Sequence, residues 1–362
     1  MRVLLCLLLW LAGCTTVPEE PEPSVLAVLV AESLALDVAT SGRGGLNVNI
    51  RVFESDQTTP GSIYLAAAQV RSVEQRYLPY VLKTTLDRSG HWGAVRVVPR
   101  NDPSAEILVV GRVVVSTGVE LKLHLRVVDA TGRVWIDQVY HDVADDIDYA
   151  TDPNFVIDPF RDLYHRVAND MAVVASQLNE QDHEEIVNTA TVRYGQLLSS
   201  QAFNRYLIPD GQRVRLTGLP AADDPLYLGV QKIRESEYLF TDSVDAYYES
   251  LYRTLGPIYA WWRYYSFELV MGNERLAGID ATRGATRGSW YAMERTYKTF
   301  KEAKMNQDAL RELSESFDRE TAPTTTEIAG RVVRLNGTID TQYEAWRRIL
   351  AEMYDEEFNP ER

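Results

Sequence analysis

The sequence predicts an α+β fold, in which an antiparallel or mixed sheet carries helices on one face and is followed by a mainly α-helical region. Residues 119–127 alternate apolar and polar side chains, as a strand with one buried face requires. Residues 163–178 place apolar side chains three and four positions apart, which is typical of an amphipathic helix. Because helical patterns dominate beyond this point, we predict an α+β domain over residues 25–178 and a helical domain over residues 179–362.

The elements of the first domain come in an order that favours a single sheet. Turn signals at residues 116–118 and 129–132 separate the last three strands into an antiparallel meander. Strands and helices in this order pack naturally as a sheet with helices on one face. We expect helices at residues 63–88 and 159–178, and strands at residues 46–52, 94–98, 107–115, 119–127 and 134–140.

The turn that follows the alternating strand contains residues with distinct expected roles. Gly132 is expected at a positive φ, Asp129 to bond the turn through its carboxylate, and Trp135 to pack nearby. Residues 105–113, with Gly111-Arg112-Val113, and residues 126–135 together resemble the periplasmic α/β domains of the TolB N-terminal, CsgG and LpoB type. The resemblance covers residues 46–178. It implies an envelope location and an assembly or partner-binding role, without a common catalytic site, and it carries over no functional residue.

The N-terminus has the features of a processing signal. A short apolar run follows Arg2, too short to span a bilayer as a helix but sufficient for the core of a signal peptide. The run ends in Leu11-Ala12-Gly13-Cys14, which resembles the lipobox of bacterial lipoproteins. That resemblance implies removal of residues 1–13, acylation of Cys14, and, with Thr15 next, attachment to the periplasmic face of the outer membrane. Residues 14–24 would then form an acylated, Pro- and Glu-rich tether.

Composition excludes several classes of site. The chain contains two cysteines, Cys6 and Cys14, and the processing just described would leave no thiol for a disulfide, a catalytic nucleophile or zinc. A net charge of −15 at pH 7 argues against nucleic acid and against a basic lipid-binding face. We expect no metal and no cofactor.

The helical region is dense in aromatic side chains between residues 243 and 271, with a break between two helices expected at Gly256-Pro257. A further amphipathic helix is expected at residues 289–320, and Thr338 is expected to cap a last helix that extends to about residue 354. The aromatic rings suit three uses: core packing along one helix face, a protein interface, or stacking on a sugar. The candidate partner or glycan surface consists of Tyr247, Tyr252, Trp261, Trp262 and Tyr265.

The function that fits these observations is a non-catalytic outer-membrane lipoprotein that binds another envelope protein as an accessory, assembly or scaffold subunit. One alternative is a peptidoglycan-binding or glycan-cleaving lipoprotein that uses the aromatic helices. Paired carboxylates such as Glu235 and Glu237, or Glu268 and Glu274, are its candidate acids. A second alternative is a component of a secretion channel, although the strand at residues 119–127 is short for a pore hairpin.

Overall fold

A computed structural model describes residues 32–36, 45–55, 68–150, 158–283, 324–328, 331–335 and 338–358. Cys14 and the expected tether lie outside these described residues, as does the helix expected at residues 289–320. Residues Ala31–Arg362 belong to one compact unit. The division at residue 178 into two domains stays a prediction.

The described part contains one large mixed sheet, which confirms the predicted α+β class. Strand β1 lies between β3 and β4 and is parallel to both, whereas β4, β5 and β6 form the expected antiparallel meander. The short β2, Glu54–Ser55, pairs with β4 off this path. In sheet order the main strands are β3 (Val95–Val98), β1 (Val48–Arg51), β4 (Ile107–Ser116), β5 (Glu120–Asp129) and β6 (Val134–Val143).

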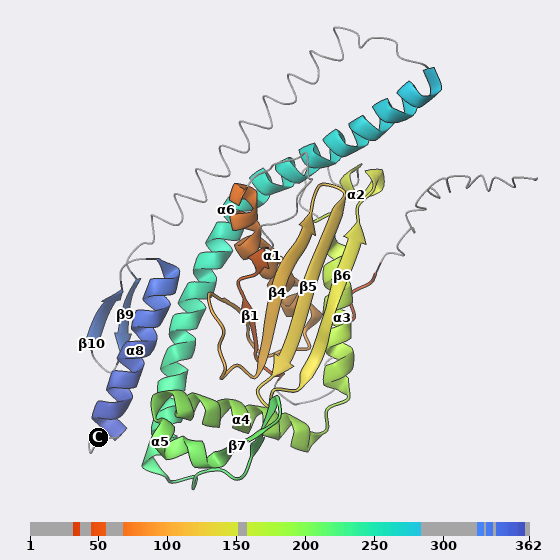
Figure 1. The fold of residues 1–362 in the computed structure, drawn as a ribbon. Coiled ribbons are helices and arrows are strands. Elements are labelled where there is room, and N and C mark those ends of the chain that lie inside the picture. The colour runs from red at the N-terminus through yellow and green to blue at the C-terminus, as the bar shows by residue number, and fades with distance from the viewer. Residues whose placement is uncertain are drawn as a thin grey trace, which may run out of the picture. The chain divides into compact units, whose positions relative to one another are not determined.

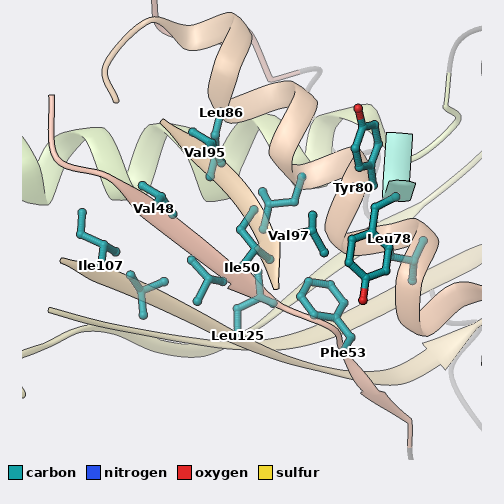
Figure 2. Close-up of a cluster of buried hydrophobic side chains, with 14 of the residues drawn as sticks. Val48, Ile50, Phe53, Leu78, Tyr80, Leu86, Val95, Val97, Ile107 and Leu125 are labelled. Atoms are coloured by element: carbon teal, nitrogen blue, oxygen red, sulfur yellow. The ribbon is translucent and has the colours of Figure 1, made fainter. Parts of the chain in front are cut away.

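One face of the sheet forms the hydrophobic core. On β5 the alternating side chains Leu121, Leu123, Leu125 and Val127 are buried on this face, as their period of two predicts. Helices α1 (Ala68–Ser89) and α3 (Arg161–Ser176) lie against it (Figure 1). In Figure 2, Leu86 of α1 lies beside Val95 of the sheet, and Leu78 of α1 lies near Phe53.

The opposite side of β4, β5 and β6, here called the open face, carries polar and charged side chains that alternate with the buried ones. On β5 these include Lys122, His124 and Arg126, all only partly buried. Asp137 on β6 pairs with both His124 and Arg126 across the strands. The strand therefore has one core face and one face toward solvent, as its sequence predicts.

The turn after β5 matches its expected roles. Gly132 adopts a φ of 85°, in the left-handed region that glycine tolerates. One carboxylate oxygen of Asp129 accepts from the backbone N–H of Thr131 at 2.9 Å and from its hydroxyl at 2.6 Å. The other accepts from the indole N–H of Trp135 at 2.9 Å. This last bond also fixes the ring over the turn.

The remaining elements are mainly helical, and their bounds are given at the end of this paragraph. Thr338 accepts from the Thr341 backbone N–H at 3.3 Å, which confirms it as the cap of the last helix, α8 (Ile339–Phe358). None of the helices in the described ranges combines the length and apolar content needed to cross a bilayer. These elements are α2 (Asp146–Ala150), α4 (Glu180–Leu198), α5 (Ser200–Phe203), η1 (Asn204–Tyr206), α6 (Pro225–Arg283) and α8 (Ile339–Phe358), with two hairpins, β7 (Leu207–Asp210) with β8 (Arg213–Leu216) and β9 (Thr324–Ile328) with β10 (Arg331–Leu335).

The expected break at Gly256-Pro257 is wrong, because α6 continues through Pro257. The pyrrolidine ring lies on the exposed side of the helix. Buried side chains recur every three or four residues on both sides of it, including Leu251, Leu255 and Tyr259. Packing of this continuous stripe outweighs the cost of about 3 kcal/mol that an internal proline imposes.

Helix α6 also closes one edge of the sheet. Its Asp245 carboxylate accepts from the backbone N–H of Val97, on edge strand β3, at 3.0 Å. Beside it, Arg96 of β3 donates to Asp242 of α6 at 2.5 Å. The helical region thus satisfies one backbone N–H, that of Val97, which an edge strand otherwise leaves open.

Candidate functional site

The aromatic segment of α6 packs mainly into the protein interior. Tyr252 stacks on Tyr77 of α1 with ring centroids 4.9 Å apart, and Tyr259 approaches the same ring at 4.4 Å. Trp262 is 6% exposed and stacks on Tyr259 at 5.6 Å. These rings join α6 to α1 in the manner of core packing.

The other candidate aromatic residues are placed differently from these. Tyr247 is half-buried against the core, whereas Trp261 is 53% exposed and meets Tyr264 edge-on at 6.3 Å. Tyr265 lies within α6, but its side chain falls outside the described part of the structure. The five candidates therefore do not converge on one described groove.

The two adjacent tryptophans provide a direct test of this placement. Replacing Trp262 by alanine is expected to lower the free energy of unfolding by about 3–5 kcal/mol, because a buried ring leaves a cavity. The matched Trp261→Ala change is expected to cost less than about 1 kcal/mol, since that ring is half exposed. Urea unfolding of both variants measures the difference. Equal losses would contradict the placement of these rings.

Beneath the aromatic rings lies a buried charge cluster, here called the Glu74 cluster, of Glu74, Ser116, Tyr259 and Arg263. Glu74 on α1 accepts from the Ser116 hydroxyl at 2.5 Å and from the Tyr259 hydroxyl at 2.8 Å. The Arg263 Nη2 atom lies 3.7 Å from a Glu74 oxygen, and Nη1 donates to the Thr117 carbonyl at 2.6 Å. The cluster connects α1, the turn between β4 and β5, and α6.

Burial controls the ionisation of this cluster. It raises the pKa of Glu74, although the Arg263 guanidinium and the two hydroxyl donors oppose that shift. Burial also raises the pKa of Asp158, again against Arg263. The guanidinium therefore helps to keep two carboxylates charged, and it lies over the Phe160 ring at 4.7 Å from the centroid.

A second buried cluster, here called the Asp102 cluster, consists of Asp102, Ser104, Glu237 and Arg347. Arg347 on α8 donates to Asp102 at 2.9 Å and to Glu237 on α6 at 2.8 Å. Ser104 donates to the same Asp102 oxygen from its hydroxyl at 2.6 Å. Burial acts to raise the pKa of Asp102, but Arg347 and Ser104 outweigh it and hold the pKa below its usual value.

A small polar cavity adjoins the Asp102 cluster. Its volume of about 10 Å³ has room for roughly one water molecule. Arg234 on α6 reaches its wall and donates to the Ser104 carbonyl at 3.0 Å. The cavity is lined by Asn47, Asn49, Asp102, Ser104, Ala105, Glu106, Arg234, Glu237, Tyr238 and Thr241.

The chemistry of these clusters is that of structural ion pairs. Glu235 is exposed while Glu237 is buried on Arg347, so this candidate pair of acids does not face one common space. Glu268 is exposed, and the side chain of Glu274 lies outside the described part. Within the described residues, no group of three or more His, Cys, Asp or Glu side chains is arranged to hold a metal ion.

Sequence reasoning missed the central residues of both clusters. Glu74 and Tyr259 are 185 positions apart, and Asp102 and Arg347 are 245 positions apart, so no local spacing connects them. The one available signal was an arginine within an apolar helical stripe, Arg263 next to Trp262. A charge at a core position predicts a buried partner, but not which residue it is.

Comparisons with known proteins add little to this geometry. No family model and no curated protein matches the chain. One solved structure that it matches is protein XCC0632 from Xanthomonas campestris, of family DUF330, with 11% identity over 40% of this chain and 94% of that chain. The TM-score is 0.25, at which the likeness carries no information about fold or function.

Proposed function

We propose that this protein is a lipid-anchored accessory or scaffold subunit on the periplasmic face of the outer membrane, where it binds another envelope protein without catalysis. The sequence Leu11-Ala12-Gly13-Cys14 supports the anchor, and the Pro- and Glu-rich segment after it suits a spacer. Anchoring confines the folded part to one surface and raises its effective concentration toward a partner there.

The observation that carries the binding proposal is the open face of β4, β5 and β6. Exposed Val134 and Val139 lie among charged side chains such as Arg126 and Asp137 on this broad surface. Apolar side chains surrounded by polar ones are typical of protein interfaces. A sugar-binding groove instead requires accessible aromatic rings, and Tyr259 and Trp262 are buried in the core.

The test compares full-length protein with its Cys14→Ser variant in cells, with Cys6→Ser as the matched control. Wild type and Cys6→Ser are expected in the outer-membrane fraction with acyl chains on Cys14, because several buried chains form a stable anchor. Cys14→Ser is expected to lose acylation and leave that fraction. Crosslinking in intact envelopes, followed by mass spectrometry, is expected to recover one stoichiometric envelope protein with wild type.

Two outcomes would contradict the proposal in separable ways. Retention of Cys14→Ser in membranes, with no acyl chain on wild type, would remove the anchor. Recovery of murein fragments in place of a protein would replace the scaffold role with glycan binding. Crosslink sites on the open face, at residues such as Arg126, would locate the interface.

A further inference from the structure

The two edge strands of the sheet, β3 and β6, differ in length and in what covers them. Edge strand β3 has four residues and is covered by α6, whose Asp245 accepts from the Val97 N–H. Edge strand β6 has ten residues, and among the described strands it pairs with β5 alone. Long open edges recruit further strands, so proteins normally shorten, cover or pair them. β6 is therefore the edge that is available for pairing.

The register identifies which groups β6 directs outward. Ala144 N–H donates to the Val119 carbonyl, so in the alternating antiparallel ladder the even-numbered residues of β6 bond β5. The backbone N–H and C=O groups of Asp137, Val139 and His141 point the other way. Among the described residues, one contact reaches these groups, from Arg166 Nη2 to the His141 carbonyl at 2.7 Å. A carbonyl oxygen can accept a second bond.

We propose that this edge pairs with the β6 edge of a second copy of the chain, antiparallel and centred on Val139. A two-fold axis at this residue places Val139 of one copy opposite Val139 of the other. The outward backbone N–H and C=O of each Val139 then bond to the other. The side chain of Val139 is 53% exposed, and its apolar surface is covered by the same residue of the other copy. The pairing joins two sheets into one continuous sheet.

The acidic and imidazole side chains on β6 favour a second copy and select this register. Centring on Val139 places Asp137 of each copy opposite His141 of the other. Within one chain, His141 already contacts Glu120 at 2.9 Å, and Asp137 contacts His124 at 2.9 Å. The paired edge therefore carries alternating acidic and basic groups across both sheets. A carboxylate directly across a strand pair from an imidazole can accept a hydrogen bond from it, whereas a shift of register loses this match.

The first test uses cysteine crosslinking of the full-length protein in detergent. Residues opposite each other in a hydrogen-bonded pair have Cα atoms about 5.5 Å apart, which suits a disulfide. Val139→Cys is therefore expected to give a covalent dimer on mild oxidation. Asp137→Cys alone is expected to give none, while Asp137→Cys combined with His141→Cys is expected to give one. Wild type, with Cys6 and Cys14, is the control for other thiols.

The second test uses sedimentation, which requires no crosslink. Wild type is expected at twice the mass of one chain after correction for detergent. Val139→Lys is expected at the mass of one chain with an unchanged circular dichroism spectrum, because it sets two like charges opposite each other across the proposed pairing. Leu239→Lys, at another exposed apolar position, is expected to remain a dimer. The proposal would be overturned if wild type were a monomer, or if Asp137→Cys alone crosslinked as well as Val139→Cys does. Crosslinking of Val139→Cys to a different protein would also overturn it.

Discussion

Replacing Arg347 by methionine is expected to lower the free energy of unfolding by about 3–5 kcal/mol. The change removes the cation that donates to both Asp102 and Glu237, and these two buried carboxylates form no other ion pair with the described residues. The aliphatic part of the side chain is retained, so the loss reports the charge. Urea unfolding at neutral pH, with fluorescence and circular dichroism as separate probes, measures it.

Arg100→Met is the matched control for Arg347→Met. Arg100 also connects the segment after β3 to α8, through an ion pair with Glu344, but both partners of that pair are about half exposed. Exposed pairs contribute roughly 0–1 kcal/mol, so little change is expected. If both variants lost a similar free energy of unfolding, burial would not be the reason that the Asp102 cluster stabilises the protein.

Arg263→Met is expected to have an effect of similar size, about 3–5 kcal/mol at neutral pH, because it leaves Glu74 buried without its guanidinium. The Glu74→Gln/Arg263→Met double variant is expected to be more stable than Arg263→Met alone, since it removes the unpaired charge. Arg253→Met, which breaks an exposed ion pair with Glu249 on the same helix, is the control and is expected to change little.

The Arg263→Met loss is also expected to depend on pH in a defined direction. The pKa of Glu74 is already raised in the folded protein, mainly by burial, and removing Arg263 raises it further. The folded state then binds a proton more readily than the unfolded state, so stability falls as pH rises through this range. Part of the loss measured near pH 7.5 should therefore be recovered near about pH 5. If the stability lost in Arg263→Met did not depend on pH, the unpaired Glu74 carboxylate would not be its cause.

The strands of the sheet were predictable because their signal is local. The period of two in β5 depends on neighbouring side chains alone, and the bond that the Thr131 N–H donates to the Asp129 carboxylate spans two residues. The position of β1 between β3 and β4 was not predictable, since parallel pairing joins segments far apart in the sequence. Pro257 misled the prediction for α6 because its effect on one turn is smaller than the packing of the buried stripe that crosses it.

The candidate site was less predictable than the fold. The many aromatic residues between positions 243 and 271 pointed to core packing, a protein interface or sugar stacking. Their four-residue spacing is consistent with the first of these uses. Which rings are buried depends on α1, whose Tyr77 receives both Tyr252 and Tyr259. The adjacent positions 261 and 262 illustrate the limit, because one helical step separates an exposed ring from a buried one.

The close approach of α6 to the turn between β4 and β5 has a consequence for the order of folding. Gly118 N–H donates to the Ser266 hydroxyl 148 positions away, and a Cβ on Gly118 would lie 2.0 Å from the Phe267 backbone nitrogen. Because synthesis starts at the N-terminus, all residues of the β4–β5 hairpin are present long before residue 267 is added. During that interval Glu74 lacks Arg263 and β3 lacks Asp245. The sheet reaches its final state only after α6 arrives, so we expect slow, late consolidation of this protein.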